Sequence, residues 1–72
     1  MPRPTVAAVP GLLHWRVERA MTQAELADKS GVDRTTIARL ERGTAAKMET
    51  IRRLADALKV EPSQLLHQWG DA

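Results

Sequence analysis

The chain has 72 residues, which is enough for one domain but leaves little room for a second core or a deep catalytic cleft. It contains no cysteine, so neither disulfides nor thiolate-bound metal ions hold its core together. The net charge is only +2, from 11 Lys and Arg against 9 Asp and Glu, so a nucleic-acid partner has to be argued from where the cations lie. Phe and Tyr are absent, which argues against stacking platforms for single-stranded nucleic acid.

Membrane insertion and export are not indicated by the sequence. No apolar run approaches the roughly 20 residues needed to cross a bilayer. The start, MPRPTVAAVPG, lacks a long apolar core followed by a cleavage site. We therefore expect a cytoplasmic protein without a membrane partner.

Proline marks the first part of the chain. Residues 1–10 hold three of the four prolines, so we expect an extended N-terminal arm there and one folded domain over residues 11–72. The stretch LLHWRVERA predicts a first helix from residue 12 to about residue 20.

The second helix has a clear start and a clear stop. Thr22 and Glu25 have the spacing of a capping box, while Met21 and Leu26 have that of a hydrophobic staple. The helix is predicted to run to about Ser30, where the following glycine offers the left-handed backbone that ends a helix within one residue.

A third helix is predicted almost at once. Asp33 is a good N-cap, and Val32 with Ile37 forms another staple around it. The helix should run to Glu41 or Arg42 before Gly43 ends it. Its inward positions would be Val32, Ile37 and Leu40, and its outward positions are Arg34, Thr35, Ala38, Arg39 and Arg42.

Two more helices complete the prediction of an all-α domain without strands. In METIRRLADALKV the apolar residues recur at i, i+3, i+4 and i+7, at Ile51, Leu54, Ala55 and Leu58. Pro62 suits the first turn of a short last helix, PSQLLHQW, which Gly70 is expected to end.

The second and third helices have the spacing of a helix-turn-helix. Counted from Gln23, the small residue Ala27 comes four positions on and Gly31 eight positions on, so two short helices can cross steeply with only about three residues between them. In this motif the second helix lies in the major groove of DNA.

The same residues resemble a known family. TQAELADKSGVDRTTIARLERG, followed by ETIRRLADALKVEPSQLL, is similar to the Cro and phage-repressor type of helix-turn-helix protein, the XRE family, over about residues 12–66. The resemblance implies a compact five-helix, lambda-repressor-like domain, usually dimeric, that binds operator DNA in the nucleoid of a bacterium or phage-infected cell.

The resemblance also implies roles for single residues. Gln23 matches a glutamine that contacts phosphate and braces the recognition helix. The base-reading positions are matched by Arg34, Thr35 and Arg39. Arg16 and Glu41 match an ion pair that ties the first helix to the third.

The chain departs from the family pattern at two places. Ala20 stands where a helix-ending glycine is common, so the turn after the first helix is less sharply marked. Ala46 and Lys47 replace the frequent Pro and Ser before the fourth helix, which leaves that helix with a poor N-cap.

The chemistry of the exposed side chains on the third helix also favours DNA binding. Arg34 or Arg39 can donate to guanine O6 and N7 together, and Thr35 can touch a thymine methyl group or a phosphate. The alternative is a basic face that is merely solvated. Further phosphate contacts are expected from Gln23, Arg42, Thr44 and Lys47. For Asp33 we favour N-capping over accepting from cytosine.

Two pairs of apolar residues exceed what one small core needs. Leu13 and Val17 lie off the core face of the first helix, and they are either covered by Val6 and Val9 of the arm or part of a partner surface. The second pair is Leu65 and Trp69. Because the resemblance implies a dimer and tryptophan anchors interfaces well, we expect a homodimer through the last helix, with Leu65 able to pack inside the monomer and Trp69 in the interface.

Metal binding and catalysis are not predicted. The two histidines, His14 and His67, lie far apart in sequence without a further ligand at helical spacing. No nucleophile has a histidine and carboxylate arranged around it, so we expect no enzyme, no cofactor and no small-molecule ligand.

The sequence thus predicts a dimeric repressor that binds an inverted-repeat operator in double-stranded DNA. Two alternatives remain open. One is an antitoxin or restriction-modification controller that regulates its own operon. The other is a protein-interaction module that keeps the fold without the DNA contacts.

Overall fold

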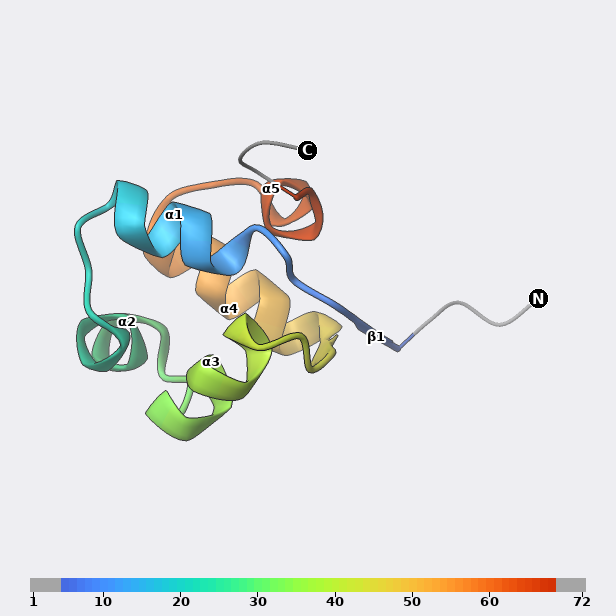
Figure 1. Ribbon diagram of the computed structural model, residues 1–72, viewed down its shortest axis with the longest axis horizontal. Coiled ribbons are helices and arrows are strands. Elements are labelled where there is room, and N and C mark those ends of the chain that lie inside the picture. Colours follow the sequence, from blue (N-terminus) through green and yellow to red (C-terminus); the bar gives the residue numbers. More distant parts are fainter. Residues whose placement is uncertain (1–4, 69–72) are drawn as a thin grey trace.

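The computed structural model describes residues 5–68, and Figure 1 draws the arrangement of the elements. In chain order these are β1 (Val6–Ala7), α1 (Leu12–Glu18), α2 (Gln23–Ser30), α3 (Arg34–Glu41), β2 (Ala46–Lys47), α4 (Met48–Leu58) and α5 (Pro62–Leu66). The predicted helices are confirmed, although α1 and α5 end earlier than expected. The backbone of His67 is already extended, with φ −92° and ψ 138°.

The core lies around α4, which crosses the middle of the domain and packs mainly against α2 and α5 (Figure 1). α3 packs on α2 and α1, and α1 also packs on α5. All four of its predicted apolar positions are buried, at most 2% exposed. The inward faces of α2 and α3 are confirmed in the same way. The buried residues are Val9, Leu12, Leu26, Val32, Ile37, Leu40, Ala46, Ile51, Leu54, Ala55, Leu58 and Leu65.

Each of the helices α1 to α4 is followed within two residues by a residue with a left-handed backbone. Gly31, at φ 75°, donates its amide to the carbonyl of Ala27 at 2.9 Å, which closes α2. Ala20 has the same conformation, with φ 54°, and takes the place that a glycine would fill more easily. The turn after α1 is therefore as sharp as a glycine turn, but it is built on a residue that resists the conformation.

A short pair of strands was not predicted. Val6 lies opposite Lys47 and Ala7 opposite Ala46 in an antiparallel pair. Pairs of two residues carry no alternation pattern, and the partners are about 40 positions apart in sequence, so local signals could not indicate them. Val9 of the predicted arm is buried as well, at 2% exposed.

The apolar surface residues are distributed differently from our expectation. Leu65 is fully buried, so it is a core residue and not part of a partner surface, because α5 turns this side chain against α4 and α1. Leu13 and Val17 are 47% and 60% exposed, so the idea that the arm covers them is wrong. Leu66 is exposed beside Leu65, and Trp69 lies outside the described residues.

Candidate nucleic-acid interface

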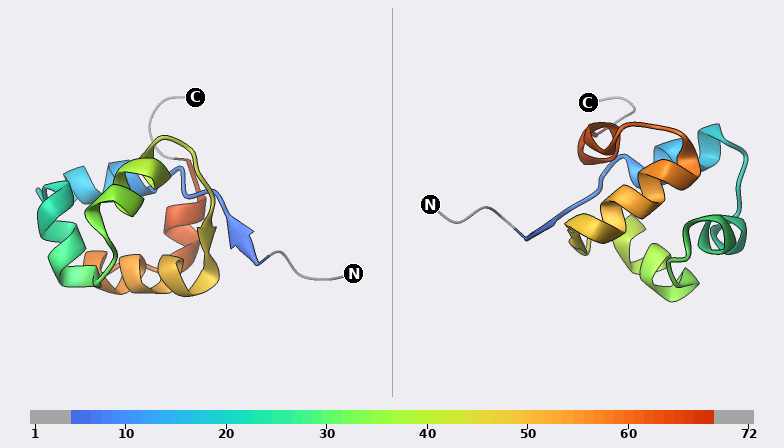
Figure 2. Two further views of the ribbon diagram at one scale, coloured as in Figure 1. Left: turned by 90° about the horizontal axis from the view of Figure 1, so that it is seen from below. Right: turned by 180° about the vertical axis from the view of Figure 1, so that it is seen from behind.

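The exposed face of α3 is the candidate interface, and α3 lies at the edge of the domain in both views of Figure 2. Ile37 and Leu40 face the core, at 0% and 3% exposed. Since α3 has only eight residues, these two anchors and its termini fix which way its other face points. The exposed polar side chains are Arg34, Thr35, Arg39 and Arg42, with Ala38 half-buried between them.

The corner before α3 is set by capping. The carboxylate of Asp33 accepts a hydrogen bond from the amide of Thr35 at 3.1 Å, which confirms it as the N-cap. This use of the carboxylate reduces its repulsion toward an approaching phosphate, since part of its charge is engaged by the first turn of the helix. At the other end Thr44 donates its amide to the carbonyl of Arg39 at 3.1 Å, around a left-handed Gly43.

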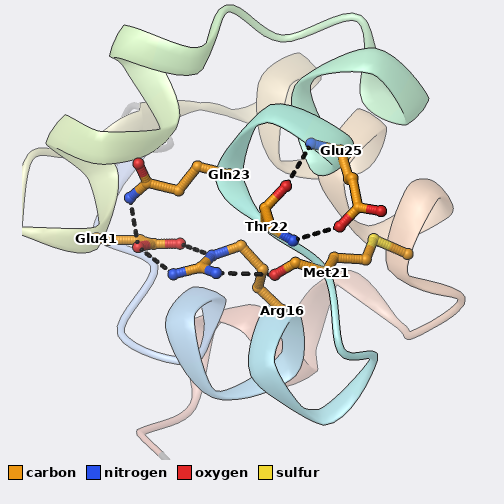
Figure 3. A network of polar contacts seen from close by, with 6 residues as sticks. All are labelled: Arg16, Met21, Thr22, Gln23, Glu25 and Glu41. Atoms are coloured by element: carbon orange, nitrogen blue, oxygen red, sulfur yellow. Dashed lines mark hydrogen bonds and ion pairs between the residues drawn. The ribbon is translucent and has the colours of Figure 1, made fainter.

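A polar network holds α3 against α1 and α2, as Figure 3 shows. Glu41 accepts from Nε and Nη2 of Arg16 at 2.6 and 3.0 Å, and from Nε2 of Gln23 at 2.9 Å. The ion-paired side chains are 15% and 8% exposed, for Arg16 and Glu41 respectively. Hydrogen bonds to the carboxylate raise the pKa of Arg16, so the guanidinium stays charged at any working pH.

Arg16 also fixes the loop between α1 and α2. Its Nη1 donates to the carbonyl of Met21 at 2.8 Å, just before the capping box of α2 (Figure 3). In that box Thr22 donates its amide to the Glu25 carboxylate at 2.8 Å, and the amide of Glu25 donates to the Thr22 hydroxyl at 3.0 Å. The network therefore fixes three helices relative to one another, and the first turn of α2 is defined at the same time.

The side chain of Gln23 has a double use in this arrangement. One amide hydrogen goes to Glu41, whereas a glutamine amide carries a second hydrogen and a carbonyl oxygen. The position at the first turn of α2 also offers backbone amides that no helical carbonyl accepts. Gln23 can thus brace α3 and still donate to an anion outside.

A shallow groove runs beside α3, between its second half and the start of α4. It has a volume of about 330 Å³ and brings together three hydroxyl groups and two cationic groups. Its lining residues are Thr36, Arg39, Leu40, Thr44, Ala45, Ala46, Lys47 and Thr50. Lys47 is the N-cap residue of α4 and forms no side-chain cap, as expected, so its ammonium group is not used in capping that helix.

One anchoring residue escaped the sequence analysis. Arg19 follows α1 and donates from Nε to the carbonyl of Leu58 at 2.8 Å, while its guanidinium carbon lies 5.0 Å from the ring centre of Trp15. It thereby ties the end of α1 to the end of α4. The only available signal was an arginine four positions after a tryptophan in a predicted helix, which is too common to be informative.

The described part of the chain contains neither a cluster of metal-ligating side chains nor a helix that could span a membrane. Within residues 5–68, no group of three or more His, Asp or Glu side chains is arranged to hold a metal ion. None of the helices in that part of the chain is long and apolar enough to cross a membrane.

A steep glycine corner, a capped and braced second helix, and a cationic outer face on that helix together define a helix-turn-helix DNA-binding domain. The helix-turn-helix family model matches residues 12–65, which is most of the chain. The chain belongs to this family, in its Cro/C1-type branch, and is a DNA-binding regulator of transcription.

Several solved structures are similar to this chain. The chain is similar to the restriction-modification controller protein C.AhdI from Aeromonas hydrophila, with 36% identity over 76% of this chain and 85% of that one, and a TM-score of 0.73. A hypothetical transcription factor from Neisseria, NHTF, is 34% identical over 81% and 68% of the two chains, with a TM-score of 0.74.

The chain is also similar to a small part of a much longer enzyme. A Streptomyces albus 2-hydroxyethylphosphonate dioxygenase is 31% identical over 92% of this chain, with a TM-score of 0.76, but the match covers only 15% of that enzyme. The similarity therefore concerns one part of a much longer protein. A comparison with curated protein sequences gives no match.

Proposed function

We propose that this chain is a sequence-specific repressor that acts as a homodimer and inserts α3 of each subunit into the major groove of an inverted-repeat operator. The observation that carries the proposal is the division of α3 into a buried apolar face and an exposed face with Arg34 and Arg39, next to which the exposed Arg42 follows as the C-cap. Glu41 accepts three hydrogen bonds from Arg16 and Gln23, so this face has a fixed orientation in the folded domain.

The bases are read by Arg34, Thr35 and Arg39 in this proposal. Each arginine carries the planar donor fork that matches O6 and N7 of guanine, a contact worth about 1 to 3 kcal/mol of discrimination. Thr35 is short and lies between them in sequence, so it suits a thymine methyl group. Because α3 exposes these side chains without a competing ion pair among the described contacts, they are available to the DNA.

The phosphates on either side are held by Gln23, Arg42, Thr44 and Lys47. Gln23 stands at the first turn of α2, while Thr44 and Lys47 line the groove at the start of α4. We expect these positions to contact the sugar-phosphate backbones beside the groove that receives α3. Their contacts would set affinity and register, and would weaken steeply with salt.

A second copy is proposed to bind the exposed apolar residues of α1 and α5. Leu13, Val17 and Leu66 are between 43% and 60% exposed, and Trp69 follows α5 outside the described residues. Replacement of Val17 by Asp should shift the protein to a monomer in analytical ultracentrifugation. The same change at the exposed Arg52 of α4, Arg52→Asp, is the control that should leave the oligomeric state unaltered.

Restriction-modification control is the second candidate function, and two of the similar structures are controller proteins of that kind. The similarity to C.AhdI covers 85% of that protein, in contrast to the small part of the dioxygenase. A controller would bind DNA upstream of its own gene, next to genes for a nuclease and a methyltransferase. A repressor of other genes would have its preferred site elsewhere.

The test is selection of bound duplexes from a random DNA pool at near-physiological salt, with wild type and Arg39→Ala in parallel. The proposal expects an enriched inverted repeat with half-sites about one helical turn, roughly 34 Å, apart. Arg39→Ala should lose the preference at one position of each half-site. Arg53→Ala, in an exposed ion pair on α4, is a control that should keep the wild-type site.

Two results would contradict the proposal. A folded wild-type protein that enriches no duplex would favour the protein-interaction module, with Leu13, Val17 and Trp69 as the next residues to test. An enriched site that Arg39→Ala, Arg34→Ala and Thr35→Ala all leave unchanged would remove base reading from α3.

A further inference from the structure

The N-terminal segment pairs with β2, which contains Lys47 and follows the loop with Thr44, both proposed phosphate contacts. Val6 and Ala7 pair with Lys47 and Ala46, and the amide of Met48 donates to the carbonyl of Thr5 at 3.4 Å. β2 follows directly on the loop after α3, and Lys47 is both its last residue and the residue before α4. Residues 5–7 are thus in a position to decide how that loop presents its side chains.

The register of the strand pair determines where Lys47 points. Residues that are opposite each other in an antiparallel pair share one face, so Val6 and Lys47 lie on one side, with Ala7 and Ala46 on the other. Ala46 is 4% exposed and Ala7 packs on the core, whereas Val6 and Lys47 are exposed. A slip of one residue would turn Lys47 toward the core.

Two residues on each side are too few to form a stable pair by themselves. The pairing is supported from the next residues along the chain. Val9 is buried at 2% exposed, and the amide of Gly11 donates to the carbonyl of Leu65 at 2.8 Å. Because residues 9–11 are anchored in the core, residues 6 and 7 meet β2 at a small cost in chain entropy.

The groove beside α3 places the side chain of Lys47 next to the recognition helix. Lys47 lines it together with Arg39 of the recognition helix and with Thr36, Thr44 and Thr50. A lysine side chain is long and flexible, and it loses rotamer freedom when it binds. A cross-strand valine beside its aliphatic stem limits that freedom before DNA arrives.

We propose that β1 is a positioning element for DNA binding, in which Val6 holds Lys47 outward toward a phosphate next to the base-reading Arg39. The inference rests on the proposed function and adds a residue to it that the helix-turn-helix does not contain. Val6 makes no contact with DNA in this account. It acts through Lys47.

The test is a double-mutant cycle in the full chain, measured by fluorescence anisotropy with the selected operator duplex at several salt concentrations. Val6→Gly removes the cross-strand side chain and weakens the strand. Lys47→Ala removes the proposed phosphate contact. Val6→Thr keeps a β-branched side chain and is the matched control.

Val6→Gly and Lys47→Ala are each expected to weaken binding by about three- to tenfold, as for the loss of one hydrogen bond of ordinary strength at an exposed site. Lys47→Ala should lower the slope of log K against log salt by about 0.9, the value for one phosphate, and Val6→Gly by a part of it. The double variant should bind no more weakly than Lys47→Ala. Val6→Thr should bind like wild type, and no variant should change the preferred bases.

Hydrogen exchange of the Met48 amide gives an independent readout of the strand pair, and it should become faster in Val6→Gly but not in Val6→Thr. Losses that add in the double variant, or an unchanged salt slope in Val6→Gly with faster exchange, would overturn the inference. If Lys47→Ala leaves the slope unaltered while wild type still selects an operator, this inference fails alone. Absence of salt-dependent binding by folded wild type would refute the proposed function with it.

Discussion

Replacing Glu41 by alanine should be among the most damaging single changes in this domain. The carboxylate is 8% exposed and accepts from Arg16 twice and from Gln23 once. Its removal leaves the guanidinium of Arg16, whose side chain is 15% exposed in the intact domain, with the carbonyl of Met21 as its partner among the described contacts. An uncompensated charge in such a place costs more than the ion pair contributes when it is intact.

The loss of unfolding free energy in Glu41→Ala can be estimated from the burial of the ion pair. Breaking a fully buried pair costs about 3 to 5 kcal/mol, and partial solvent access of Arg16 lowers this to about 2 to 4 kcal/mol. A domain of 72 residues has a free energy of unfolding of about 4 to 11 kcal/mol, so Glu41→Ala should consume a large part of it. The midpoint of thermal unfolding should fall by about 10 to 25 °C.

The assay is urea unfolding followed by far-UV circular dichroism, with equal slopes in wild type and variant as the check that both unfold in one step. Two controls separate charge from packing. Glu41→Gln keeps an acceptor oxygen and should lose less than Glu41→Ala. The pair Arg16→Met with Glu41→Leu removes both charges and should recover most of the loss, although the Met21 carbonyl then lacks its donor.

Two results would refute this reasoning. A cost below about 1 kcal/mol for Glu41→Ala would mean that water replaces the carboxylate without penalty, and that the pair behaves like an exposed one. A double apolar variant as unstable as the sum of the two single variants would mean that no unpaired charge causes the loss.

Three further changes test single steps of the fold. Ala20→Gly should raise the free energy of unfolding by about 0.5 to 1 kcal/mol, since relief of the left-handed φ of 54° outweighs the extra entropy of an unfolded glycine; chemical denaturation that gives no gain would contradict this. Gly31→Ala should lower the free energy of unfolding by about 1 kcal/mol through backbone strain alone, because no atom lies within 4 Å of the added Cβ. An unchanged free energy of unfolding in the same assay would contradict the left-handed turn at Gly31. The hydrogen bond from the Thr22 amide lowers the pKa of Glu25, so this carboxylate stabilises the fold above its unfolded pKa and ceases to do so as the pH falls through its folded pKa. Glu25→Gln can keep the box without that titration, so the gap in unfolding midpoint between wild type and variant should change over this acidic range, and a constant gap would exclude the carboxylate as the cause.

The helices could be predicted because their signals are local. Thr22 and Glu25 form the capping box that their spacing indicates, Asp33 caps α3, and Gly31 takes the left-handed backbone. The apolar period of α4 matches its buried face position for position. In these cases a residue and its partner lie within four positions, so sequence spacing is almost equivalent to geometry.

What could not be predicted depends on residues far apart in the chain. The pairing of Val6 with Lys47 and the anchoring of Arg19 on Leu58 each join segments about 40 positions apart. For the last helix the sequence analysis gave Leu65 two possible places, the core of the monomer or a partner surface with Trp69, because a helix of five residues has too few turns to define a face. Leu65 therefore proved to be core and Leu66 surface.

The brace also determines how stability and DNA binding should be linked. An eight-residue helix does not persist alone in water, so α3 is ordered only as far as Ile37, Leu40 and the Glu41 network hold it. Binding to DNA requires the ordered form, and the apparent dissociation constant rises in proportion as the ordered fraction falls. A variant of the brace that stays largely folded should consequently bind almost as well as wild type and prefer the same bases. Loss of preference at one base, with stability unchanged, is what replacement of Arg34 or Arg39 should produce instead.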